Sequence, residues 1–132
     1  MGDVKYLLDT HTLLWMAQDE VKLGKNALDI VGNIDNQLFV SSVSVYEITY
    51  KHQIGKLAGY EYFVKNFFDI IKKLDLKELP LDIRHAHFAG SLKWQHRDPF
   101  DRLLAAQAAV DELVLLTNDA AFDEMSGVAV VW

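Results

Sequence analysis

The sequence contains no cysteine, and this absence removes several kinds of chemistry from consideration. Without thiols, the chain forms no disulfides, binds no metal through thiolates and has no cysteine nucleophile. It also has no apolar run of membrane-spanning length, and residues 1–5 lack the basic-then-apolar pattern of a signal peptide. We therefore expect a cytoplasmic protein that does not associate with membranes.

Positive charge is scarce, since 13 Lys and Arg residues against 19 Asp and Glu give a net charge of −6. Such a balance argues against broad, non-specific nucleic-acid binding, which relies on a basic surface. It does not exclude a nuclease whose acidic site holds a metal and whose positive charge is local. Two basic groups follow acidic residues: Lys51, His52 and Lys56 after Glu47, and Lys93, His96, Arg97 and Arg102 around Asp98 and Asp101. Each group alone is most simply a solvated surface.

Glycine-rich phosphate-binding loops are absent as well. Neither G-x-x-x-x-G-K-[ST] nor G-x-G-x-x-G occurs, and the G-x-S-x-G motif of serine hydrolases is missing. The five histidines do not have the spacing of a metalloprotease site. His85 and His87 lie two residues apart, and we expect both to face solvent or the flank of a helix.

What the chain does have is a regular alternation of strand and helix patterns, consistent with a single domain over residues 1–132. We predict strands at residues 4–8, 37–40, 76–81, 113–116 and 128–131, and helices at 10–18, 25–34, 41–54, 60–73, 82–92, 99–112 and 119–124. Alternation of this kind predicts right-handed crossovers and a mostly parallel sheet covered on both faces. Pro80 places the third strand at an edge of the sheet or marks its end.

Acidic residues recur where a predicted strand gives way to a helix. Asp9 closes the first strand, Asp119 follows the fourth, and Glu47 and Asp101 lie near the starts of helices. In a parallel sheet these positions meet at the carboxyl ends of the strands, where ligands bind. Carboxylates gathered there repel one another unless a cation lies between them. The sequence thus predicts a divalent-metal site formed by Asp9, Glu47, Asp101 and Asp119.

Most of these acids also have a local structural explanation. Asp9 fits the N-cap of the following helix, and Asp119 fits the cap of a short helix. Asp98, Pro99 and Asp101 form an acidic variant of the capping box, with Pro99 at the first helical position. A cap contributes about 1 kcal/mol to stability. We assign the cap to Asp98 and the ligand role to Asp101.

Glu47 is harder to explain by capping. A helical turn of about 100° per residue places it on a stripe with Val43, Tyr50 and Ile54. A buried carboxylate on an apolar stripe must find a partner, reach solvent or become protonated, because an unpaired buried charge is costly. The partner is either a cation at the sheet edge or, in the structural alternative, Lys51 or an arginine.

With these positions in place, the chain resembles the PIN-domain nucleases, and more narrowly the VapC-type ribonuclease toxins of type II toxin–antitoxin systems. The segments that carry the resemblance are LLDTHTLLW, SSVSVYEI, HRDPFDRLLAAQA and LLTNDAAF, in family order and across nearly the whole chain. HRDPFDRLLAAQA is the most specific of them. The acidic metal ligands of the family fall on Asp9, Glu47, Asp101 and Asp119, whereas Asp98 is not one of the four core positions. Thr117 matches a polar position often found beside the last acid.

The resemblance implies a three-layer α/β/α sandwich with a short, mostly parallel sheet, Mg²⁺ or Mn²⁺ dependence, homodimers, and a cognate antitoxin protein that covers the site. An oxygen-rich ligand set without cysteine suits Mg²⁺, which retains several waters. The expected reaction is hydrolysis of an RNA phosphodiester bond without a covalent intermediate. We expect Arg97, Arg102 or Lys93 to steer the phosphate backbone.

Two other functions stay open at this stage. An aspartate-based phosphoryl-transfer enzyme would use Asp9 as nucleophile or metal ligand on a similar sheet. However, Asp9-Thr10-His11 lacks the second aspartate of that phosphatase motif, and Trp132, instead of a lysine, follows the last strand, unlike a receiver domain. A non-catalytic protein-binding domain would keep its acids only as helix caps.

Overall fold

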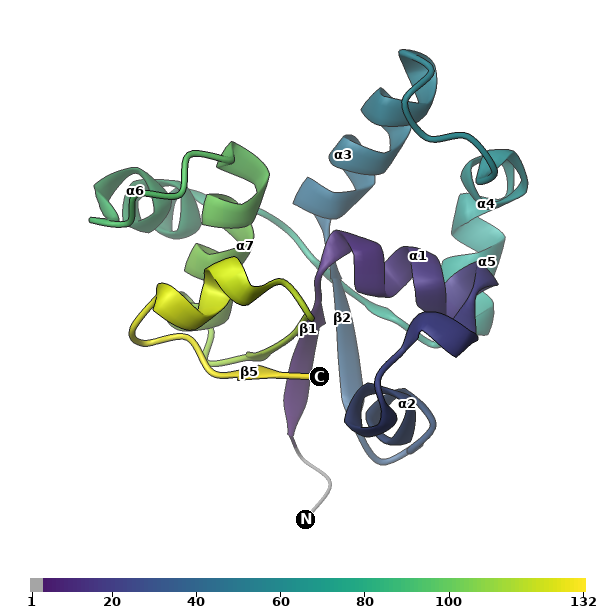
Figure 1. Cartoon of the computed structure of the whole chain (residues 1–132), viewed down its shortest axis with the longest axis horizontal. Helices are drawn as coiled ribbons and strands as arrows, with labels where there is room; N and C mark the ends of the chain where they lie inside the picture. Colours follow the sequence, from purple (N-terminus) through teal and green to yellow (C-terminus); the bar gives the residue numbers. More distant parts are fainter. Residues whose placement is uncertain (1–3) are drawn as a thin grey trace.

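The computed structural model describes residues 4–132, and its centre is a five-stranded sheet with helices on both faces (Figure 1). The strands are β1 (Lys5–Leu8), β2 (Gln37–Ser41), β3 (Lys77–Leu79), β4 (Val114–Leu116) and β5 (Val130–Val131). They are ordered β3-β2-β1-β4-β5, and every neighbouring pair is parallel. The predicted parallel sheet is confirmed, with β1 in the middle and the short β3 at an edge.

Helices connect consecutive strands: two α-helices lie between β1 and β2, three between β2 and β3 and two between β3 and β4, and a 3-10 turn lies between β4 and β5. The helices are α1 (Thr10–Gln18), α2 (Lys25–Val31), α3 (Ser42–Gln53), α4 (Glu61–Lys65), α5 (Phe67–Lys73), α6 (Ile83–Ser91) and α7 (Pro99–Val110), with 3-10 turns η1 (Glu20–Lys22) and η2 (Ala120–Glu124). Of the helices in residues 4–132, none combines the length and the apolar character needed to cross a membrane.

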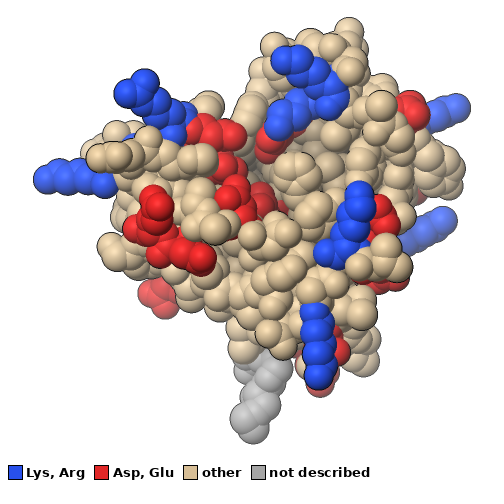
Figure 2. Space-filling model, in the orientation of Figure 1, with Lys and Arg blue, Asp and Glu red and all other residues tan. Residues whose placement is uncertain are grey.

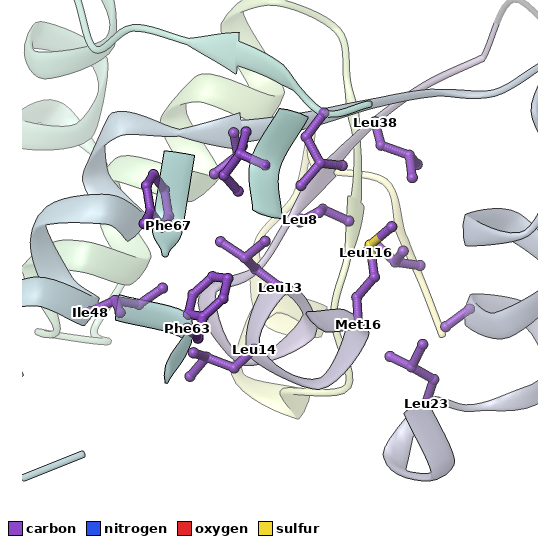
Figure 3. Close-up of a cluster of buried hydrophobic side chains, with 14 residues drawn as sticks. Leu8, Leu13, Leu14, Met16, Leu23, Leu38, Ile48, Phe63, Phe67 and Leu116 are labelled. Atoms are coloured by element: carbon purple, nitrogen blue, oxygen red, sulfur yellow. The ribbon is translucent and has the colours of Figure 1, made fainter. Parts of the chain in front are cut away.

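The two faces of the sheet bury alternate residues of the same strands. Leu8 and Leu116 contribute to one core cluster, which Leu13 of α1 and Phe67 of α5 complete (Figure 3). Their neighbours in the strands, Leu7 and Leu115, belong to a second cluster, with residues of α7. Because side chains along a strand alternate between faces, a sheet buried on both sides requires such consecutive leucines. This arrangement confirms the three-layer α/β/α fold.

The predicted helix 60–73 is interrupted at Asn66, which separates α4 from α5. The backbone of Asn66 has φ −108° and ψ 26°, outside the helical region. Its side-chain amide donates a hydrogen bond to the carbonyl of Tyr62 at 2.9 Å, alongside its own backbone N–H at 3.0 Å. Asparagine competes for local backbone groups in this way, which weakens a helix from within.

The prediction that both histidines face solvent or the flank of a helix is wrong for His85, which is buried. His87 is exposed. The His85 side chain is only 1% exposed because it joins α6 to the end of α7. Its Nδ1 accepts the backbone N–H of Asp82 at 3.0 Å, and its Nε2 lies 2.7 Å from Asp111 Oδ2. Asp82 reciprocates by accepting the His85 backbone N–H, which completes a capping box at the start of α6.

Candidate metal centre

Polar residues are buried at the carboxyl ends of the three central strands. Asp9 follows β1, Ser41 ends β2 and Thr117 follows β4, and their exposed fractions are 6%, 0% and 4%. Because the strands are parallel, these ends lie at one edge of the sheet. Figure 2 shows acidic side chains gathered in a hollow on this side, between α3 and α7.

Asp9 uses both carboxylate oxygens in hydrogen bonds. Oδ1 accepts the backbone N–H of Thr10 at 2.7 Å and so caps α1, and Oδ2 accepts the hydroxyl of Thr117 at 2.7 Å. Burial raises the pKa of Asp9 despite these bonds, and the charge of Asp119 raises it further. Within residues 4–132 Asp9 forms no ion pair. The cap explains its position, and among nearby charges His11 favours the ionised carboxylate whereas Asp119 opposes it.

Glu47 is buried on α3 and is linked to the Asp9 region through Thr10. Its Oε1 accepts the Thr10 hydroxyl at 2.8 Å, and its Oε2 pairs with the Lys51 ammonium at 2.5 Å. The ion pair with Lys51, which the sequence left open as the structural alternative to a bound cation, is present. The predicted apolar stripe is only half buried, since Tyr50 is 46% exposed one turn further along α3.

Asp98 and Asp101 open α7, and a loop histidine lies against them. Asp98 caps the helix by accepting the Phe100 N–H at 2.9 Å, as predicted. Asp101 Oδ2 lies 2.6 Å from His96 Nε2. Burial raises the pKa of Asp101 to about 6, and the negative charges of Asp98 and Asp9 add to this effect. The hydrogen bond to Asp101 in turn raises the pKa of His96.

Asp119 is exposed and begins η2, where its Oδ1 accepts the Ala121 N–H at 2.9 Å. Its own backbone N–H donates to the Thr117 hydroxyl oxygen at 3.0 Å. Thr117 therefore lies between the two aspartates, because the same hydroxyl donates to Asp9. This contact fixes where η2 begins relative to the end of β4.

The four predicted acids lie at one edge but do not all come within direct ligand distance of each other. The charge of Asp9 raises the pKa of Asp101, and that of Asp119 raises the pKa of Asp9. In the described part of the chain, the trio with ligand atoms within 4.8 Å of one another is His96, Asp98 and Asp101. Mg²⁺ keeps several waters and needs only one or two direct carboxylates. A shared ion would therefore reach some of the four predicted acids through water.

His96 and Thr10 contribute to this site although the sequence did not predict a role for either. The hydroxyl of Thr10 connects to Glu47, which is 37 residues away, and the ring of His96 folds back onto Asp101. No spacing rule predicts such contacts. The signal available for His96 was its place in the HRDPFDR segment, immediately before the cap of α7.

Arg102 was expected to steer a phosphate backbone, but the structure gives it another task. Its guanidinium donates to four backbone carbonyls, those of Ala89, Leu92, Trp94 and His96, at 2.6–3.1 Å. A guanidinium bonded in this way is not free for a ligand. Lys93 and Arg97 are exposed on the same loop and stay available to an anion.

The PIN-domain family matches residues 6–128 of this sequence. The chain belongs to the PIN-domain family. Its members are nuclease-type hydrolases, so the resemblance drawn from the four sequence segments is confirmed at the level of the family. No curated protein matches the sequence.

Solved structures with a similar fold include proteins of toxin–antitoxin complexes. The structure of VapBC2 from Rickettsia felis bound to a promoter DNA fragment matches with a TM-score of 0.73 and 16% identity, over 98% of this chain and 99% of that chain. DNA-bound VapBC from Salmonella typhimurium matches with a TM-score of 0.74 and 21% identity, over 97% of each chain. FitAcB from Neisseria gonorrhoeae matches with a TM-score of 0.71 and 17% identity, over 96% of each chain. At these identities the likeness is one of fold.

Proposed function

We propose that the chain is a Mg²⁺- or Mn²⁺-dependent endoribonuclease and the toxin of a type II toxin–antitoxin pair. The observation that carries the proposal is the state of Asp9, which is 6% exposed at the tip of the central strand. It has no ion-pair partner in the described residues, and its negative charge raises the pKa of Asp101. A buried negative charge of this kind is stabilised by a cation.

The donor set fits a hard divalent ion. It consists of carboxylates, without thiolates, which favours Mg²⁺ or Mn²⁺. We assign Asp9, Glu47, Asp101 and Asp119 as the residues that hold the ion, directly or through water. When bound, it would supply an activated water and stabilise the charge that develops on the phosphate.

The chain's own residues orient the site and attract the substrate. The hydroxyls of Thr10 and Thr117 donate hydrogen bonds to Glu47 and Asp9 and so orient these two carboxylates. We propose hydrolysis by water without a covalent intermediate. Lys93 and Arg97, exposed on the loop before α7, place positive charge beside the acids and would attract the anionic phosphate backbone.

For partners we propose a cognate antitoxin and a second copy of the chain, and for the substrate RNA. An apolar groove of about 730 Å³ lies between α3, α5 and β3, and Phe68 at its rim is 82% exposed. Exposed apolar patches of this kind mark interaction sites. Several solved structures of this fold are named VapBC, which supports an antitoxin as a partner, and we propose that it occupies this groove.

A non-catalytic domain whose acids serve only as caps explains part of the arrangement. Asp9, Asp98 and Asp119 do cap helices. Capping does not explain Glu47, which lies inside α3, or the raised pKa of Asp101. The phosphoryl-transfer alternative is less well supported, since Asp9-Thr10-His11 lacks the second aspartate of that phosphatase motif.

The test is expression of the chain with and without its neighbouring small gene, combined with RNA cleavage by the purified protein. Wild type should arrest growth when expressed alone and should cleave RNA in Mn²⁺ but not in EDTA. Asp101→Asn should do neither. Equal toxicity of the substituted protein, or cleavage that persists in EDTA, would contradict the proposal.

A further inference from the structure

The loop between α6 and α7 is fixed to the start of α7 by Arg102. Its four hydrogen bonds reach the end of α6 at Ala89 and the loop at Leu92, Trp94 and His96. Hydrogen bonds from a charged donor are stronger than neutral ones. Arg102 follows Asp101 directly in the chain, so the loop and the acid at the start of α7 form one unit.

Trp94 supports the ring of His96 within this loop. The Trp94 side chain is 8% exposed and lies 5.6 Å from the ring of Phe122, between centroids. Its ring is 4.8 Å from that of His96, at an interplanar angle of 40°. The imidazole is thus held by its backbone on one side and by a buried indole on the other. Its Nε2 ends 2.6 Å from Asp101 Oδ2.

We propose that His96 is a positioning residue, which orients the Asp101 carboxylate for metal binding. The inference rests on the proposed function and extends it to a residue outside the four acids. His96 Nε2 donates to Oδ2, which fixes the rotation of the carboxylate and leaves Oδ1 to bind the cation. The 2.6 Å separation has no room for an ion between the two atoms, so Nε2 serves as a donor and not as a ligand.

The stability of the fold alone gives little reason for this arrangement. The His96 side chain is 30% exposed, and an ion pair so near the surface contributes little to stability. By contrast, hydrogen bonds that orient a metal ligand are worth about 10–100-fold in metal affinity. We therefore infer that the main effect of the loop held by Arg102 and Trp94 is to orient the Asp101 carboxylate through His96.

Mn²⁺ binding to the full chain, followed by electron paramagnetic resonance, tests this role. We expect His96→Ala to weaken Mn²⁺ affinity by about 10–100-fold. We expect His96→Gln, whose amide N–H also reaches a carboxylate, to recover most of the affinity. His87→Ala provides the matched control, because His87 is exposed on α6 and contacts none of these acids, and its Mn²⁺ affinity should equal that of wild type.

Two outcomes would overturn the positioning role while leaving the metal site in place. One is an unchanged Mn²⁺ affinity in His96→Ala. The other is a directly coordinated nitrogen in the electron spin-echo spectrum of wild type that His96→Ala removes, since this would make His96 a ligand. A failure of the proposed function looks different, because wild type itself would then bind no Mn²⁺.

Discussion

The chain contains two histidine–aspartate pairs of nearly the same length in very different surroundings. His85 and Asp111 are 2.7 Å apart, and His96 and Asp101 are 2.6 Å apart. In the first pair His85 is 1% exposed and Asp111 also binds the Arg84 guanidinium. In the second pair His96 is 30% exposed, and the charges of Asp98 and Asp119 also raise its pKa.

The difference shows that the pair itself does not mark a functional site. Both ring nitrogens of His85 are hydrogen-bonded, and Asp82 and Asp111 both bind the Arg84 guanidinium, so the polar side chains of this group satisfy one another. Around Asp101 the burial and the charges of Asp98 and Asp9 all raise its pKa. We infer that an excess of negative charge, more than any single contact, separates the metal centre from a structural joint.

The largest expected effect is on RNA cleavage by matched substitutions in the two pairs. Asp101→Asn removes a proposed metal-binding charge, and we expect the cleavage rate to fall at least about 100-fold. Asp111→Asn changes the same group in the structural pair and should leave cleavage within a few-fold of wild type. Similar losses in both variants would mean that the contrast drawn between the pairs is wrong.

The opposite order is expected for folding stability. His85→Ala leaves Asp111 and the backbone N–H of Asp82 without their buried partner, at a cost of about 2–3 kcal/mol in the free energy of unfolding. His96→Ala should cost less than about 1 kcal/mol, because its pair is partly exposed. Urea denaturation in metal-free buffer measures both. Equal losses of unfolding free energy in the two variants would mean that the His85–Asp111 and His96–Asp101 pairs do not differ in their structural role.

Mn²⁺ affinity should depend on pH through Asp101, whose pKa is about 6. Protons and the cation compete for the same carboxylate, so the affinity should be constant above this pKa and decrease as the pH falls through it. The expected slope is about tenfold per pH unit below pH 6 for one competing proton. Calorimetric titration between pH 5 and 7.5 measures it, and a flat profile would be inconsistent with Asp101 as a ligand.

The smallest effect is expected at Asp98, which caps α7 beside the site. Asp98→Ala should cost about 1 kcal/mol of stability, and Asp98→Ser, which keeps a capping oxygen, should recover most of it. If Asp98 only caps, Asp98→Ser should also cleave RNA at nearly the wild-type rate. A large loss of cleavage in a fully stable Asp98→Ser protein would add Asp98 to the metal centre.

Positions set by strand ends could be predicted from the sequence. Asp9 and Asp119 follow apolar runs that become β1 and β4, and the parallel alternation alone places both at one edge. Asp98 was predictable as a cap because the residues that satisfy it are its own neighbours. Local patterns and topology carry this information, and they sufficed for the fold.

Contacts across long separations could not be predicted in this way. His85 was expected to face solvent or the flank of a helix, and no local pattern indicates its contact with Asp111, which lies 26 residues further along the chain. Arg102 was expected to steer phosphate because it is a positively charged residue close to the acids in the sequence. The backbone carbonyls that accept its hydrogen bonds come within reach only through the folded path of the loop, which the sequence does not reveal. The break at Asn66 was missed because the apolar pattern continues through it, from Phe63 to Phe67.

The central claim is that the acidic edge of the sheet holds a divalent cation, and anomalous diffraction from crystals grown with Mn²⁺ tests it most directly. The account predicts an anomalous peak in the hollow between α3 and α7, adjacent to the carboxylates of Asp9 and Asp101. A peak only at Asp82 and Asp111, or none beside Asp9 at saturating Mn²⁺, would contradict it.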